Sequence, residues 1–279
     1  SRTFSRIAQT IARSGCGAKL LGPDEAHILY PLPWHELARS VDVFTGQSLP
    51  ARRGAEAHNV GFLTKCYADM TRRPVHSATQ IVMYAGSPSP EEVQRRYSEV
   101  LQSGGEGQML IAEEWGDREL SHHQYSAPER WETVKNLLAL MSAHRVQTPR
   151  ESKVGILFSS PSAMAQGRAM DHTPIEAAYS LIGPVCGAWP RMIDSLALAQ
   201  AAETLDGLSL LILPSCPYER PEVLDCLEAF VSRGGRLICC DPQGLRRDTL
   251  GAPLPSRDLL GARARKIEPQ REMGMDWPA

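Results

Sequence analysis

The first half of this sequence alternates four times between short apolar segments and longer amphipathic segments, and this alternation constrains the fold more than any other feature. The apolar segments have the length of buried strands, and the amphipathic segments repeat apolar residues at helical spacing. Strands that alternate with helices through short connections form βα units around a parallel sheet. The expected elements are helices at 3–14, 34–40, 59–72, 89–103 and 129–144, and strands at 18–22, 41–44, 74–82 and 107–112.

The length of this half shows how much of a known architecture these units can fill. A complete barrel of eight βα units takes about 250 residues, or about 30 residues per unit. Residues 1–146 hold four strands at that spacing. They therefore predict an α/β fold in which half of a TIM barrel is present rather than a whole one.

A second alternation, with its own spacing, follows a polar linker at 147–152. It predicts a flavodoxin-like, doubly wound α/β domain at 147–245. Gly, Pro and Arg are frequent beyond that domain and the periodicity is lost, so we expect an irregular tail at 246–279. The expected elements of the second domain are strands at 153–159, 191–195, 209–214 and 236–241, and helices at 173–183 and 220–233.

The charge balance and the cysteines exclude several kinds of partner and cofactor. Thirty basic and 32 acidic residues give a net charge of −2 without long charge blocks, so neither nucleic acid nor a membrane is an expected partner. The seven cysteines show no zinc spacing, so we expect no metal and no cofactor. The N-terminus lacks the pattern of a signal peptide, which favours a cytoplasmic protein, although a longer, exported parent is compatible with this sequence.

Polar and aromatic residues follow all four strands of the first half, and parallel sheets gather their chemistry at the carboxyl ends of the strands. Hydroxyl groups of a sugar bind carboxylates and amides, and the apolar face of its ring packs on an indole. We therefore expect a carbohydrate site. Its expected substrate-binding residues are Gln47, His76, Gln80, Glu113 and Trp115.

Glycoside hydrolysis usually uses two carboxyl groups on either side of the scissile bond, and Glu114 and Glu25 are the expected catalytic residues. Residues alternate between the faces of a strand, so Met109, Ile111 and Glu113 share one face. If the apolar Met109 and Ile111 face the outer helices, Glu114 points into the barrel. The alternative is that the acids after this strand are solvated loop residues, and the spacing alone is equally compatible with it.

Cys216 follows a predicted strand, as a nucleophilic cysteine can. Its neighbours are Ser215 and Pro217 rather than the glycines of a tight nucleophile turn, and no base lies near it in the sequence. A structural role is therefore the expected one, and catalysis at Cys216 is the weakest of the alternatives.

Two stretches resemble a known family. Residues 73–115 resemble the seventh strand, seventh helix and eighth strand of clan-A glycoside hydrolase barrels, in particular the family 42 β-galactosidases. Residues 153–164 and 208–241 resemble the β-galactosidase trimerisation domain, a class I glutamine-amidotransferase-like domain that lacks the amidotransferase nucleophile. The resemblance implies a β-galactosidase-like glycoside hydrolase with a carbohydrate substrate, which assembles as a homotrimer through its second domain.

The same resemblance implies that the four strands are the fifth to eighth of the barrel and that the chain is truncated at its N-terminus. The acid/base glutamate of the family, which ends the fourth strand, would precede Ser1. Its nucleophilic glutamate, at the end of the seventh strand, falls on Thr79 or Gln80, neither of which can form a glycosyl ester. The alignment is shifted by a loop, Glu114 substitutes, or the chain is an inactive relative. We expect the fragment to be inactive; the alternative function is non-catalytic carbohydrate binding or assembly on the same scaffold.

Overall fold

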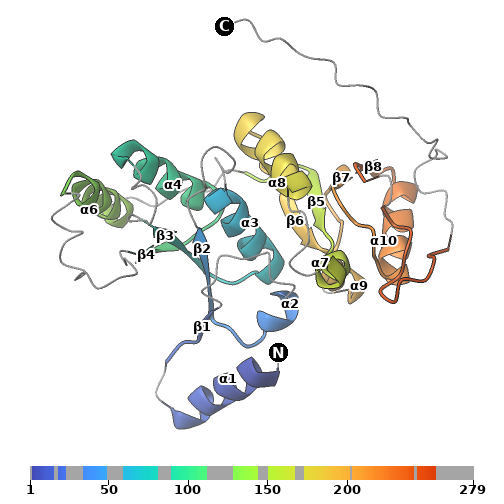
Figure 1. Cartoon of the computed structure of the whole chain (residues 1–279), viewed down its shortest axis with the longest axis horizontal. Coiled ribbons are helices and arrows are strands. Elements are labelled where there is room, and N and C mark those ends of the chain that lie inside the picture. Colours follow the sequence, from blue (N-terminus) through green and yellow to red (C-terminus); the bar gives the residue numbers. More distant parts are fainter. Residues whose placement is uncertain are drawn as a thin grey trace, which may run out of the picture.

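The computed structural model describes residues 2–15, 18–22, 34–48, 59–80, 89–111, 128–143, 150–166, 173–201, 203–241 and 244–255. These residues form an α/β structure with two four-stranded parallel sheets, each accompanied by helices (Figure 1). The first sheet contains β1 (Leu21–Gly22), β2 (Val43–Ser48), β3 (Val75–Gln80) and β4 (Gly107–Ile111). Its helices are α1 (Arg2–Ser14), α2 (Trp34–Leu37), α3 (Asn59–Thr71), α4 (Pro90–Gln102) and α6 (Pro128–Ala143).

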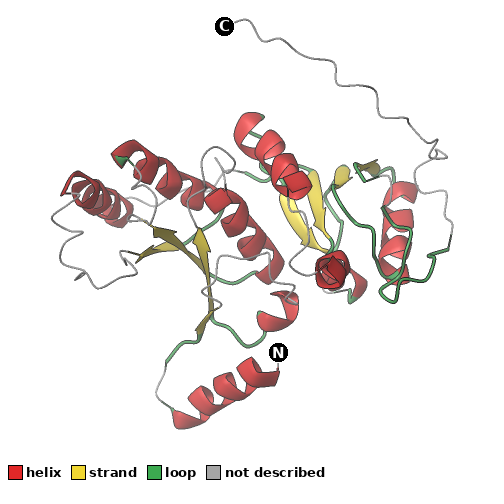
Figure 2. Cartoon of the chain, viewed as in Figure 1, coloured by secondary structure: helices red, strands yellow, loops and turns green. Residues whose placement is uncertain are grey.

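The first sheet has the strand order β1-β2-β3-β4, which is the order of the strands along the chain. Each strand pairs in parallel with the next, and a helix follows β2, β3 and β4, as the alternation predicted. Within the described residues β1 pairs only with β2 and β4 only with β3, so the sheet is an open arc of βα units. Figure 2 shows this arc, with helices covering it.

The start of α4 shows how closely the local sequence specifies the structure. Ser89 is the N-cap and its hydroxyl accepts a hydrogen bond from the backbone N–H of Glu92 at 3.2 Å. Pro90 follows at the first helical position, where no backbone donor is needed. Gly104, at a φ of 88°, takes the left-handed conformation that ends the helix.

The second sheet has the strand order β6-β5-β7-β8 and is parallel throughout. Its central strands are almost fully buried, which explains their continuous apolar sequences. Two short helices that the sequence analysis did not expect, α7 and α9, follow β5 and β6 directly. The elements are β5 (Val154–Phe158), α7 (Ser160–Gln166), α8 (Thr173–Ser180), η2 (Leu181–Val185), β6 (Arg191–Asp194), α9 (Ser195–Ala199), β7 (Leu210–Leu213), α10 (Pro221–Ser232) and β8 (Arg236–Cys239).

Helix α3 lies between the two sheets and belongs to the cores of both (Figure 1). Its residues Tyr67 and Phe62 are buried: the Tyr67 ring lies 5.0 Å from Trp34, and the Phe62 ring lies 5.6 Å from Tyr179 on α8. One continuous apolar cluster therefore runs from β2 and β3 through α3 to β5, β6 and α8.

A buried ion pair on the same helix ties the two units together. The Lys65 ammonium lies 3.0 Å from Asp69 and 2.8 Å from Glu151, and the second carboxylate oxygen of Asp69 accepts a hydrogen bond from the backbone N–H of Met192 at 2.7 Å. Burial raises the pKa of Asp69 to about 6. The ion pair therefore places the buried Asp69 carboxylate at the start of β6, where it binds the backbone of Met192.

Residues 244–255 contain no helix or strand, and they pack on the second sheet unit. Leu254 is buried in its apolar cluster. The backbone N–H of Leu245 donates to the carbonyl of Cys216 at 2.8 Å, and that of Glu219 donates to the carbonyl of Arg247 at 2.9 Å. Among the described helices, none is long and apolar enough to span a bilayer.

Candidate functional site

The carboxyl edge of the first sheet is where the sequence predicts the functional site, and the register shows which positions meet there. Position 47 lies beside Ala78, and Gln80 lies beside Ile111 at the end of β4. The backbone therefore brings Gln47 and Gln80 to the same edge. The sequence predicted that this strand ends at residue 44 and that Gln47 lies in the loop after it. In the structure β2 continues to Ser48, because residues 45–48 pair with β3, so Gln47 belongs to the strand.

His76 lies at the other end of the sheet. It is the second residue of β3, in register with Thr45 and with Gly107, the first residue of β4. At about 3.3 Å per residue, it is about 13 Å from the carboxyl end of its strand. The sequence predicted that His76 lies with the residues at the carboxyl ends of the strands, but the structure places it near the opposite end of β3.

The register of β3 with β4 shows which positions of the two strands share a face. Val75 and Ser77 face the helices, because Val75 is fully buried and the Ser77 hydroxyl lies 2.5 Å from that of Thr64 on α3. Positions 76, 78 and 80 take the other face, and the register aligns Met109 with 78 and Ile111 with 80. The side chains of β4 lie outside the described residues, so the orientation that would turn Glu114 into the barrel stays a prediction.

The remaining predicted residues, Glu25, Glu113, Glu114 and Trp115, lie outside the described residues. Their roles stay predictions. The part of the chain that the structure describes holds no group of three or more His, Cys, Asp or Glu that could hold a metal ion.

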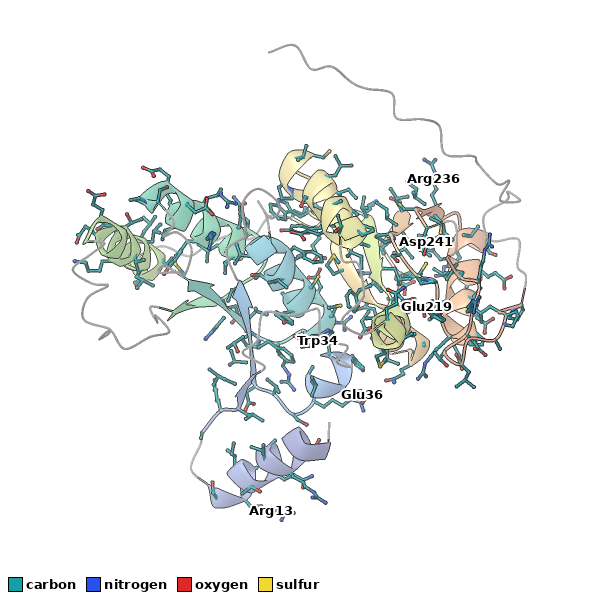
Figure 3. The ribbon with its side chains drawn as sticks, in the orientation of Figure 1. Arg13, Trp34, Glu36, Glu219, Arg236 and Asp241 are labelled. Carbon is teal, nitrogen blue, oxygen red and sulfur yellow. The ribbon has the colours of Figure 1, made fainter. Side chains whose placement is uncertain are left out.

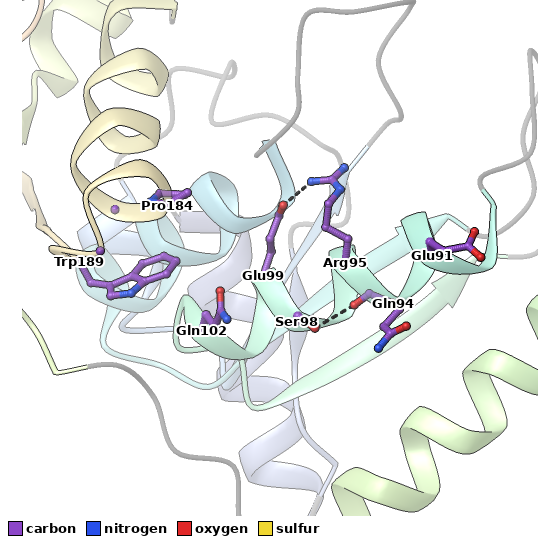
Figure 4. Close-up of a pocket in the computed structure, with 10 residues that line it drawn as sticks. Glu91, Gln94, Arg95, Ser98, Glu99, Gln102, Pro184 and Trp189 are labelled. Atoms are coloured by element: carbon purple, nitrogen blue, oxygen red, sulfur yellow. Dashed lines mark hydrogen bonds and ion pairs between the residues drawn. The ribbon is translucent and has the colours of Figure 1, made fainter.

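A pocket of about 570 Å³ opens between α4 and the turn after η2, away from the strand ends (Figure 4). The side chain of Glu99 accepts a hydrogen bond from Arg95, and the Ser98 hydroxyl donates to the carbonyl of Gln94 at 2.9 Å. The indole of Trp189 forms the opposite wall, held by an edge contact with Tyr179 at 6.1 Å. The pocket lies on the outer, helical layer of the first unit.

The carboxyl edge of the second sheet gathers buried polar side chains that the sequence analysis did not identify. Asp194, the last residue of β6, accepts hydrogen bonds from the Ser160 hydroxyl at 2.5 Å and the Leu196 N–H at 2.9 Å. Ser159 and Ser162 both donate to the carbonyl of Tyr218, at 3.0 and 2.8 Å. This arrangement fastens the residues after β5 to the loop after β7.

Glu219, labelled in Figure 3, is a fully buried carboxyl group of this cluster. Burial raises its pKa to about 7, against smaller opposing effects of the Ser159 and Ser195 hydroxyls and the backbone N–H of Arg220. Burial also raises the pKa of Asp194. The sequence holds a signal for this cluster, because Ser159 and Asp194 lie at the carboxyl ends of β5 and β6, and Glu219 lies in the loop after β7.

Cys216 belongs to the same edge but is not an activated nucleophile. It is fully buried, and its hydrogen bond to Cys239, together with burial, raises the pKa of its thiol. A catalytic cysteine that attacks a substrate entering from solvent needs the opposite pKa shift and an accessible sulfur. The structural role expected from the sequence fits this environment.

No protein-family model matches the chain, and no curated protein matches it. Similar solved structures are glycoside hydrolases. The apo exo-carrageenase GH42 from Bacteroides ovatus is 12% identical, with a TM-score of 0.57 over 80% of this chain and 34% of its own. GH5_18 from Streptomyces cattleya, in complex with GlcNAc, is 17% identical, with a TM-score of 0.53 over 76% of this chain and 59% of its own.

A β-galactosidase from Bifidobacterium adolescentis matches over only 37% of this chain and 46% of its own, at 19% identity and a TM-score of 0.32, and carries no argument. The chain thus spans between about a third and three fifths of the length of the structures it resembles. At these identities the likeness concerns the fold. The described chain is an α/β structure with parallel sheets, and its fold is similar to that of these glycoside hydrolases.

Proposed function

We propose that this chain is part of a glycoside hydrolase that binds its sugar at the carboxyl edge of the first sheet. The observation that carries the proposal is the open arc of parallel βα units, whose register brings positions 47 and 80 to one edge. The fold likeness to two groups of glycoside hydrolases supports it. Further strands beside β1 and β4 would close the arc into a barrel and complete the site.

In this proposal Glu114 and Glu25 are the catalytic carboxyl groups. Each follows a strand of the arc in sequence, β4 and β1 respectively. Glu113 and Trp115, with Gln47 and Gln80, supply hydrogen bonds and a ring platform to the sugar. A β-galactoside-like substrate is the most specific form of the proposal, and it rests on the sequence resemblance of residues 73–115, 153–164 and 208–241.

Hydrolysis of aryl glycosides by the whole natural polypeptide that contains this sequence tests the proposal. Glu114→Gln or Glu25→Gln should lower kcat/KM by about 100-fold or more, because general acid–base groups contribute about that much. Glu129→Gln, at an exposed position of α6, is the matched control and should leave the rate unchanged. Unchanged rates in both site variants would refute their assignment.

One observation favours a second candidate, a non-catalytic carbohydrate-binding or assembly protein. Strand β3 ends with Thr79 and Gln80, where the resemblance implies a nucleophilic glutamate, and neither side chain can form a glycosyl ester. Binding of sugars by the whole polypeptide without turnover, with an affinity that Glu114→Gln does not alter, would support this candidate over hydrolysis.

We also propose that the second unit is a flavodoxin-like domain that mediates self-association. Its strand order, β6-β5-β7-β8, corresponds to the first four strands of the doubly wound order 2-1-3-4-5. A trimer is the form that the sequence resemblance implies. Sedimentation equilibrium should give three times the chain mass, and a monomer at all accessible concentrations would refute the proposal.

A further inference from the structure

Two cysteines lie close together at the carboxyl ends of β7 and β8. Leu213, the last residue of β7, is in register with Cys239, the last residue of β8, and the chain after β7 bends so that Cys216 returns to this point. The Cys216 thiol donates a hydrogen bond to the Cys239 sulfur. A Cβ placed on Gly244 would lie 2.8 Å from the Cys239 sulfur and 3.2 Å from that of Cys216, so both sulfurs border one position.

The two sulfurs differ in exposure and in acidity. Cys216 is completely buried in the apolar cluster of the second unit, whereas Cys239 is only half-buried and can be reached from solvent. The hydrogen bond from Cys216 lowers the pKa of Cys239 to about 7. The Cys239 thiol also donates a hydrogen bond to the carbonyl of Asp241 at 3.2 Å. Of the two cysteines, Cys239 is therefore the one that loses its proton more readily, and the thiolate is the form that reacts with oxidants.

We propose that Cys216 and Cys239 are a redox pair that closes to an intramolecular disulfide when the protein meets hydrogen peroxide. The Cys239 thiolate attacks one peroxide oxygen, the O–O bond breaks, and a sulfenic acid forms as hydroxide leaves. The Cys216 sulfur then attacks the Cys239 sulfur. Its thiol proton and the sulfenic hydroxyl leave as water, so two thiols and one peroxide give one disulfide and two waters.

The position of the pair links its oxidation to the segment that follows β8. The backbone carbonyl of Cys216 accepts a hydrogen bond from the N–H of Leu245 at 2.8 Å, and Gly244 is so close to both sulfurs that a Cβ there would contact them. Shortening the sulfur–sulfur separation to about 2.05 Å shifts the atoms on which residues 244–255 rest. Oxidation is therefore expected to change the protease sensitivity of this segment.

Peptide mapping of the full chain tests the proposal. The reduced protein is treated with hydrogen peroxide, alkylated under denaturing conditions and digested. Two of its seven thiols should be lost, and one cross-linked species should join the peptides of Cys216 and Cys239 and disappear on reduction with dithiothreitol. The rate should rise as the pH increases through about 7, the pKa of Cys239.

Serine substitutions separate this reaction from general oxidation. Cys239→Ser should abolish the cross-link, and Cys216→Ser should leave a sulfenic acid at Cys239 that a dimedone probe labels several-fold more than in the unchanged protein. Cys226→Ser, on α10 in the same apolar cluster, is the matched control and should react normally. A bond between Cys239 and Cys240, a dimer linked through exposed Cys240, or sulfinic acid at Cys239 without a cross-link would overturn the proposal.

Discussion

Replacement of Glu219 by glutamine should make the protein more stable at alkaline pH and remove much of its pH dependence in that range. Glu219 is fully buried, and its pKa rises from 4.5 to about 7 on folding. A raised carboxyl pKa means that the folded state binds the proton more tightly than the unfolded state. The stability that the neutral acid contributes is present below the unfolded pKa and is lost as the pH rises through about 7.

The magnitude follows from the two pKa values. A difference of one unit corresponds to 1.36 kcal/mol, so the burial of Glu219 removes about 3 kcal/mol of unfolding free energy between pH 4.5 and 8.5. Glutamine has nearly the same shape and carries no charge. The unfolding free energy of Glu219→Gln, relative to the unchanged protein, should therefore rise by about 3 kcal/mol across this range.

Urea denaturation at pH 4.5 and 8.5, followed by far-UV circular dichroism, measures this difference. Comparison at each pH cancels other titrating groups, including Asp69, whose pKa is also raised. Glu222→Gln removes an exposed carboxylate from α10 and is expected to keep the original pH dependence. If Glu219→Gln and the unchanged protein show parallel pH profiles, the carboxyl group is not desolvated and the reasoning is refuted.

Three further substitutions test other parts of the fold by urea denaturation. Lys65→Met should destabilise the protein by about 3–5 kcal/mol, because Asp69 is left charged and buried. The double variant Lys65→Met/Asp69→Asn should recover part of this loss, and equal stability of the single and double variants would contradict a buried ion pair. Gly46→Ala should cost about 1–3 kcal/mol, since its Cβ would lie 2.3 Å from the Tyr67 ring, and an unchanged midpoint would refute this close contact. Ser89→Ala should cost about 1 kcal/mol through loss of the α4 cap, whereas Ser89→Asp should cost little.

The elements that local sequence specifies were predicted well. The strand at 107–112 and the helix from the Ser89 cap are found within a residue or two of the expected bounds, because turn glycines, caps and apolar runs act over a few neighbouring residues. The short helices α7 and α9 were missed. Helix α7 has seven residues and α9 has five, which is too few to show a helical period in the sequence. Both helices bury most of their residues in the second unit, and this packing is not encoded locally.

Features that depend on the partner strand or on distant residues could not be predicted in this way. The faces of β4 depend on its register with β3, which the apolar character of Met109 and Ile111 does not encode. The proximity of Cys216 and Cys239 depends on the bend after β7, which no local pattern encodes. The candidate edge at Gln47 and Gln80 was predictable, because parallel strands always bring their carboxyl ends together.

The placement of α3 between the sheets limits how this protein can be taken apart. A segment that begins at the polar linker and is produced by itself would leave Tyr179 and the inner residues of β5 without Phe62 and its neighbours. Exchange of the second unit between related proteins would have to include α3, or redesign the surface that α3 covers. The boundary for grafting therefore lies before Asn59 rather than at the linker.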